Sequence, residues 1–257
     1  MTCLDGRLFG RTLYCSLPLA RILTKGELRA IIGHELGHYK GLDTKFSQRF
    51  YPIYRGTASS IAALQAAGQE GSRAIALLPA IAVLSFFYEC FALAENAISR
   101  ERELAADREG GNVTNKETIA AALVKVHAFS GLWENLTTAA EGALREGKMF
   151  VNASKTYADV VTDNVSLDSL EGLADRELSH PTDSHPPLGV RLEALRLRIQ
   201  DVSSAALAVS PTDPAIALLP NPEATEEEIS AAYQAILARQ LGIDLGKAQE
   251  DKTGPGA

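Results

Sequence analysis

Two histidines four residues apart, with a glutamate beside the first, constrain this chain more than any other feature. They form the sequence HELGH at residues 34–38. The capping box TKGE at 24–27 predicts a helix that runs from there to about Tyr39. Residues i and i+4 share one face of a helix. His34 and His38 can therefore point an imidazole nitrogen at the same cation.

This spacing predicts a zinc site with a catalytic base. Zinc accepts nitrogen ligands at about 2.0–2.1 Å in a tetrahedral arrangement. Glu35 flanks the first histidine, so it can reach a zinc-bound water without binding the metal, and we assign it as the catalytic base. The alternative is a helix that merely carries two histidines. With five histidines in the whole chain, this pattern rarely arises by chance.

A catalytic zinc needs a third protein ligand and an open position for water. The sequence SRERELAAD at 99–107 supplies the best candidate, because Glu103 and Asp107 lie four residues apart on a predicted helix. We expect Glu103 to bind zinc. We expect Asp107 to accept a hydrogen bond from a ligand histidine and so to fix its tautomer. Glu101 lies about 160° from that face of the helix and is the weaker candidate.

A second candidate for the third ligand lies closer to the histidines. In HELGHYKGLDT, Gly41 falls where the metzincin pattern has a glycine. The metzincin ligand position, however, holds Thr44, and Asp43 is one residue short. The methionines are Met1 and Met149, which leaves little to build the Met-turn of that class. Asp43 is therefore the minor alternative to Glu103.

A third motif, SHPPLGVR at 184–191, follows the two already described. The three motifs in this order and spacing resemble the HtpX and CAAX prenyl protease type of zinc metallopeptidase, metallopeptidase family 48. The resemblance covers about residues 7–200. It implies a zinc (Zn2+) endopeptidase of mainly α (α+β) class, a zincin-like helical domain with a small β hairpin or sheet beside the active-site helix.

The resemblance also implies the roles of individual residues. The positions that match the family's zinc ligands and its catalytic acid/base are His34, His38, Glu103 and Glu35. It further implies that Arg191 pairs with Asp107, and that His185 lies near the substrate carbonyl, where it would stabilise the oxyanion. His180 is the second choice for that role. His127 fits a core or surface position better than a ligand position.

The rest of the chain predicts one domain and an extension. We expect the metallopeptidase domain at 1–205, with a sequence that begins late compared with the family. A proline-rich linker, an accessory helix and a flexible tail follow at 206–257. Residues 7–16 predict a hairpin or edge strand, to which a substrate strand could pair. The other expected helices cover about 74–109, 114–129, 133–146, 153–162 and 167–178, and two more start near 185 and 225.

Composition narrows the partners. The net charge is −7, and no basic block with interleaved aromatic residues occurs, so nucleic acid is not an expected partner. The three cysteines form no C-x-x-C pair, which excludes a cysteine zinc site and indicates reduced thiols. The expected partner is a peptide or protein substrate, with misfolded and membrane proteins as candidates. The oligomeric state is not predicted.

The stretch 74–94 is 21 residues long with one charge, which is the length of a membrane span. The three zinc ligands must meet, so the chain between them crosses a membrane an even number of times, and 56–68 is too short to be a partner span. This leaves a buried core helix, a helix dipping into one leaflet, or a hairpin bent near Pro79. The family resemblance implies a membrane-associated protein, and Arg100 and Arg102 beside the apolar segment agree with an active site that faces the cytoplasm. A soluble cytoplasmic protein is the alternative.

Two other interpretations compete with a working protease. The first is a non-catalytic scaffold or chaperone-like module that keeps zinc for structure, against which Glu35 argues, because a structural site needs no base. The second is a latent protease that requires chain upstream of this sequence.

Overall fold

The computed structural model describes residues 13–40, 43–67, 73–175 and 186–243, and these are mainly α-helical. The helices are α1 (Leu17–Ile22), α2 (Lys25–Lys40), α3 (Asp43–Ala67), α4 (Arg73–Val113), α5 (Lys116–Arg145), α6 (Ala153–Asn164), α7 (Leu188–Ala194), α8 (Ile199–Leu207) and α9 (Pro222–Gln240). Short 3-10 helices cover Leu167–Leu170, Leu173–Asp175 and Ala215–Leu218. The mainly α prediction is therefore confirmed.

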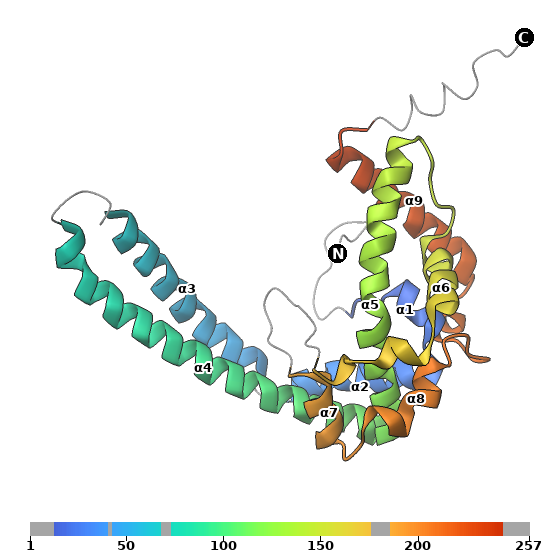
Figure 1. Ribbon diagram of the computed structural model, residues 1–257, viewed down its shortest axis with the longest axis horizontal. Coiled ribbons are helices and arrows are strands. Elements are labelled where there is room, and N and C mark those ends of the chain that lie inside the picture. The colour runs from blue at the N-terminus through green and yellow to red at the C-terminus, as the bar shows by residue number, and fades with distance from the viewer. Residues whose placement is uncertain (1–12, 41–42, 68–72, 176–185, 244–257) are drawn as a thin grey trace, which may run out of the picture.

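The molecule has a body and an arm. The arm consists of α3 and the first half of α4, residues 73–97, which extend together away from the rest (Figure 1). The body contains the remaining helices and the second half of α4, residues 98–113. Helix α4 thus belongs to both parts, and it carries the 99–107 motif where it enters the body.

No β strand is present among the residues that the structure describes, so the expected β hairpin is not confirmed. Residues 7–12 of the predicted hairpin lie outside those residues. The next few residues lead into α1, because the Ser16 side chain accepts a hydrogen bond from the Leu19 amide and Pro18 sits in the first turn. Across the described ranges, one isolated antiparallel bridge, between Thr24 and Pro214, is the β-type pairing present.

The capping box at the start of α2 is confirmed, and it is tied to α5. The Thr24 amide donates to Glu27 Oε2 at 2.8 Å, and the Glu27 amide donates to Thr24 Oγ1 at 3.0 Å. The Lys125 ammonium from α5 also donates to Glu27 Oε2, at 2.9 Å, and to the carbonyls of Ile22 and Ala208. These three acceptors compensate for the complete burial of Lys125. The start of the histidine-bearing helix is therefore held by a buried ion pair.

Helices α2 and α4 cross at small residues. A Cβ added to Gly110 would lie 2.7 Å from the Ala30 carbonyl oxygen, and one added to Gly37 would lie 3.2 Å from Ala106 Cα. Real Cβ atoms essentially never approach another atom as closely as 2.7 Å, and a contact of 3.2 Å is tighter than most, so glycine at these positions favours the close approach of the two backbones. The prediction that Gly110 and Gly111 end the helix is wrong. Helix α4 continues to Val113, and Gly110 serves the contact with α2 instead.

Helix α5 runs through the centre of the body. Its apolar residues pack against α7, α8 and the 3-10 helices, in a core that includes Ile119, Leu123, Leu173, Leu188, Leu192 and Val202. The helices predicted at 114–129 and 133–146 form one continuous helix, with Asn115 rather than Thr114 as its cap. The α-helix predicted at 167–178 is wrong for its described part, where the two short 3-10 helices at 167–170 and 173–175 replace it, and residues 176–178 lie outside the described residues. The helix expected near 185 is divided into α7 and α8, because Arg196 between them adopts a positive φ of 58°.

The segment after α8 returns to the active-site helix. The Ala215 amide donates to the Leu23 carbonyl, and the Lys25 amide donates to the Asp213 carbonyl. The accessory helix expected after residue 225 is present as α9. Its buried Glu226 forms an ion pair with Arg21 of α1. The segment around the 3-10 helix Ala215–Leu218 therefore packs against α1 and α2, whereas α9 packs mainly against α5 and α6.

Helix α4 passes through Pro79 without a break, so the hairpin bent at this residue is not observed. The described side chains between 77 and 90 are exposed or half-buried, so the buried-core interpretation is wrong as well. Phe86 is 62% exposed and Phe87 is 54% exposed. In the part of the chain that the structure describes, no helix combines the length and apolarity that crossing a membrane requires.

Candidate metal centre

The structure brings together the three residues proposed as zinc ligands. His34 and His38 come from consecutive turns of α2, and Glu103 comes from α4, which crosses α2 at the glycines described above. Their potential ligand atoms all lie within 4.8 Å of one another. His34 and Glu103 are buried and His38 is partly buried, so the group sits at the edge of the body.

The distances inside this group fit a single zinc ion. The Nε2 atoms of His34 and His38 are 3.2 Å apart. Glu103 places one carboxylate oxygen 3.6 Å from His34 Nε2 and the other 3.5 Å from His38 Nε2. In a tetrahedral site with bonds of about 2.0–2.1 Å, neighbouring ligand atoms are about 3.3–3.4 Å apart. The three side chains are therefore arranged as one face of such a site.

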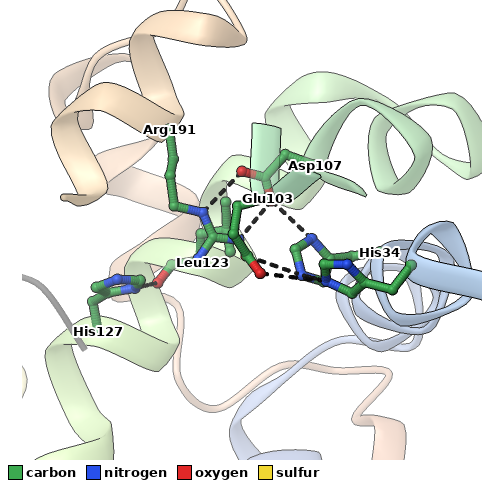
Figure 2. Close-up of polar contacts among 7 residues, drawn as sticks. His34, Glu103, Asp107, Leu123, His127 and Arg191 are labelled. Atoms are coloured by element: carbon green, nitrogen blue, oxygen red, sulfur yellow. Dashed lines mark hydrogen bonds and ion pairs between the residues drawn. The ribbon is translucent and has the colours of Figure 1, made fainter. Parts of the chain in front are cut away.

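Asp107 orients the first histidine. Its Oδ1 accepts a hydrogen bond from His34 Nδ1 at 2.9 Å, and the side chain is fully buried (Figure 2). With Nδ1 donating, a neutral imidazole presents the lone pair of Nε2 toward Glu103. Nitrogen and carboxylate lone pairs that face one another in a buried place are the arrangement that a bound cation stabilises.

Arg191 of α7 completes the buried polar group. Its Nε and Nη2 donate to the two oxygens of Asp107 at 2.8 and 2.6 Å, and its Nη2 lies 3.6 Å from Glu103 Oε2. The expected pairing of Arg191 with Asp107 is thus present. Figure 2 shows the guanidinium reaching from α7 toward both carboxylates of α4. The pair joins the third sequence motif to the second.

The charges in this group shift two pKa values in opposite directions. Burial alone would raise the pKa of Asp107, but the hydrogen bonds from Arg191 and His34 outweigh it, and the pKa lies below its usual value. Burial alone would lower the pKa of Arg191, but the hydrogen bonds and charge of Asp107 raise it. Glu103 and Glu35 add to that effect. Asp107 is therefore ionised at neutral pH.

Glu35 differs from its neighbours because it is exposed. It follows His34 directly on α2 and is close enough for its charge to act on Arg191. A carboxylate at this place can accept a proton from a molecule held at the metal centre.

Of the other residues considered in the sequence, three have side chains that the structure does not describe and one lies elsewhere in the fold. His185 and His180 lie outside the residues that the structure describes, so the oxyanion role stays a prediction. The Asp43 side chain is likewise outside them. His127 is buried on α5, and its Nδ1 donates to the Leu123 carbonyl at 2.8 Å (Figure 2). This is the ordinary behaviour of a core histidine, as expected from the sequence.

Two features that position the centre could not be recognised from the sequence. Gly110 allows α4 to approach α2, but a Gly-Gly pair near the end of a helical pattern looks like a helix stop. Lys125 anchors the start of α2 through Glu27, but a single lysine on an amphipathic helix carries no sign that it is buried. The capping box identified Glu27, so one partner of the Glu27–Lys125 ion pair could be recognised from the sequence.

Comparison with known proteins agrees with this geometry. The model of peptidase family M48 matches residues 6–199, which contain all three motifs. The chain belongs to peptidase family M48. No solved structure resembles the chain at a significant level.

Several curated M48 relatives carry the name protease HtpX homolog. The one from Archaeoglobus fulgidus is 28% identical over 193 residues, which is 72% of this chain and 55% of the relative. The one from Pyrobaculum calidifontis is 28% identical over 202 residues, covering 73% of this chain and 56% of the relative. The one from Burkholderia multivorans is 34% identical over 116 residues, covering 44% and 40%. The chain spans about half the length of the first two.

Proposed function

We propose that this M48 chain is a zinc-dependent metalloendopeptidase that hydrolyses peptide bonds of protein substrates. The observation that carries the proposal is the convergence of His34, His38 and Glu103 beside an exposed Glu35. A structural zinc site is closed by four protein ligands, whereas a catalytic site keeps three and leaves a position open. Within the described part of the chain, three potential ligand side chains converge at this place.

The residues of this chain have separate tasks in the proposed reaction. Zinc, when bound to the three ligands, supplies a Lewis acid that polarises the scissile carbonyl and makes water easier to deprotonate. Glu35 accepts the proton of the attacking water and passes it to the leaving amine. Asp107 holds His34 in the tautomer that presents Nε2, and Arg191 keeps Asp107 ionised and in place.

A Glu35→Gln variant tests the proposal against the non-catalytic scaffold. The amide keeps the size of the side chain but cannot accept the proton, so cleavage of an unfolded protein such as casein should fall by about 10²–10⁴-fold. Zinc content, measured by metal analysis, should stay that of the wild type. Glu101→Gln, an exposed carboxylate on α4, is the matched control and should keep both properties. Unchanged cleavage by the Glu35 variant would contradict the proposal.

The oxyanion stabiliser is also a proposal. We assign this role to His185, because it belongs to the SHPPLGVR motif whose Arg191 reaches the metal centre through Asp107. A His185→Ala variant should lose about 10²–10³-fold in kcat. Its KM and zinc content should change little. A His180→Ala variant with the larger loss would reverse the assignment.

We further propose that the arm lies against a membrane surface, with the active site facing the cytoplasm. Its support is the set of exposed apolar side chains on α4, which includes Leu78, Val83, Phe86 and Phe87, and the arginines that follow them. The test is co-sedimentation with lipid vesicles. Wild-type protein should sediment with them, and a Phe86→Ser/Phe87→Ser variant should not. Equal sedimentation of the two proteins would contradict the proposal.

A further inference from the structure

A groove lies along one side of α2, and Glu35 is part of its lining. Its volume is about 640 Å³, within the range of about 300–1,000 Å³ that ligand pockets have. One wall comes from α2, and the other comes from α1 and the residues just before it. Side chains from both walls line it, including Tyr14, Leu19, Ile31, Ile32, Leu36 and Tyr39.

The lining of this groove is apolar and open to solvent. Leu36 is 57% exposed and Tyr39 is 47% exposed on the α2 side, and Leu13 and Tyr14 are each 53% exposed on the other. Leaving such side chains in water costs about 25 cal/mol for each Å² of apolar surface. A contiguous exposed apolar surface marks a place where another molecule binds. The groove therefore has the character of a binding site rather than of a gap in the core.

Two observations identify the occupant. First, Glu35 belongs to the same lining, so whatever fills the groove lies directly beside the candidate catalytic base. Second, the carboxylate of Glu35 is the charged group of the lining, while the other lining residues are apolar or uncharged at neutral pH. An acidic side chain would be repelled there, and a bulky apolar side chain would lose unfavourable contact with water.

We propose that this groove is the specificity pocket of the protease, which binds a bulky apolar side chain of the substrate at a position flanking the scissile bond. This inference rests on the proposed function. It assigns the substrate class as extended chain that exposes Leu, Phe or similar residues. Such residues are buried in folded soluble proteins, so the groove selects unfolded segments.

Cys15 offers a direct measure of occupancy, because its thiol also lines the groove. Burial raises the pKa of this thiol, so alkylation should be followed near pH 9. The zinc-loaded Glu35→Gln variant would be mixed with an unfolded peptide that carries Leu and Phe, or with the same peptide carrying Asp at those positions. The rate at Cys15, resolved by mass spectrometry, should fall about fivefold or more with the apolar peptide only.

Other occupants are separated by the same assay. Equal protection by both peptides, or protection by phospholipid vesicles but not by the apolar peptide, would overturn the proposal. An alkylation rate at Cys15 that no peptide changes, but that rises in a variant lacking residues 1–12, would also overturn it, because the chain's own N-terminus would then fill the groove. The rate at the exposed Cys90 on α4 serves as the internal control for the two peptides.

Cleavage measurements test specificity separately. In Leu36→Ala and Tyr14→Ala variants, kcat/KM for a peptide with Leu at the cleaved bond should fall about tenfold, and that for its Ala counterpart should fall much less. Leu167→Ala, at another leucine that is more than half exposed, on the 3-10 helix 167–170, should change neither. Unchanged preference in both groove variants, with zinc content intact, would overturn the proposal. Selective protection of Cys15 without any wild-type cleavage would instead refute the proposed function and leave the groove as an apolar binding site.

Discussion

The two halves of helix α4 have opposite relations between side-chain polarity and burial. In the second half, Glu103 and Asp107 are buried to 5% and 0% exposure. In the first half, apolar side chains such as Leu78 and Phe86 are more than half exposed. The buried carboxylates of the second half need partners of opposite charge or hydrogen-bond donors. The exposed apolar side chains of the first half favour contact with another molecule or a membrane.

The difference shows how one helix can serve two purposes. In the second half, the charges are held by partners on other elements, namely His34 on α2 and Arg191 on α7. In the first half, α3 packs against one side of the helix and leaves the other side to solvent. Substitutions of the same type should therefore have large effects in the second half and small ones in the arm.

The largest expected effect comes from Asp107→Asn. The variant leaves the buried guanidinium of Arg191 without its closest counter-charge, and breaking a buried pair in this way costs about 3–5 kcal/mol of folding free energy. Glu89→Gln removes an exposed carboxylate from the first half of α4 and should change stability by less than about 0.5 kcal/mol. Urea denaturation of the two variants measures this difference in stability. Equal midpoints would contradict the predicted difference between the two halves of α4.

The cost of Asp107→Asn should depend on pH with a defined sign. The pKa of Asp107 is lowered in the folded protein, so its stabilisation is present above the unfolded pKa of about 3.9 and is lost as pH falls through the folded pKa. The stability difference between wild type and variant should therefore be constant from about pH 5 to 7 and shrink in stronger acid. A difference that grows below pH 4 would contradict the assignment.

Next in size is the loss of zinc from a Glu103→Gln variant. A neutral amide is a poorer zinc ligand than a carboxylate, and removing a ligand should cost more than the 10–100-fold in affinity that loss of a supporting residue causes. Glu101→Gln lies on the same helix but is exposed, and it should bind zinc like the wild type. Competition with a chromophoric chelator measures both affinities. Full affinity in the Glu103 variant would return Asp43 as the third ligand.

A smaller effect should come from glycine substitutions in the two parts. Gly110→Ala brings a Cβ within 2.7 Å of the Ala30 carbonyl oxygen and should destabilise the body by about 1–3 kcal/mol. Gly56→Ala on α3 of the arm meets no atom within 4 Å and should raise helix stability by up to about 1 kcal/mol. Opposite shifts in thermal midpoint are expected. Shifts of the same sign would show that the close crossing of α2 and α4 does not exclude a Cβ at position 110.

The smallest effect on folding is expected in the arm itself. Phe86→Ser and Phe87→Ser remove exposed side chains, so each should change the free energy of unfolding by less than about 0.5 kcal/mol. Phe129→Ser, in which a fully buried phenylalanine of α5 is changed, should cost about 3–5 kcal/mol and is the matched contrast. Calorimetry compares them. A large loss in the arm variants would mean that the arm contributes to the folded core.

Much of the site could be predicted from short-range patterns. The HELGH spacing places two imidazoles on one helical face, and the capping box TKGE set the start of that helix, which the structure confirms. Glu103 and Asp107 share a face of α4 for the same reason. Predictions of helix ends were less accurate, because Gly110 and Thr114 have signals that the packing of α4 against α2 and the Asn115 side chain override.

The sequence by itself determined which side chains are available to the candidate metal centre and in which pairs they come, because helical spacing acts within a few residues of the chain. It did not determine the distance between the two pairs, nor that the side chains of residues 77–90 would be exposed or half-buried. The tertiary structure decided both. The first depends on how closely α2 and α4 pack at their glycines, and the second depends on which surface of α4 the rest of the chain covers. These are properties of contacts between distant segments, which no local pattern encodes.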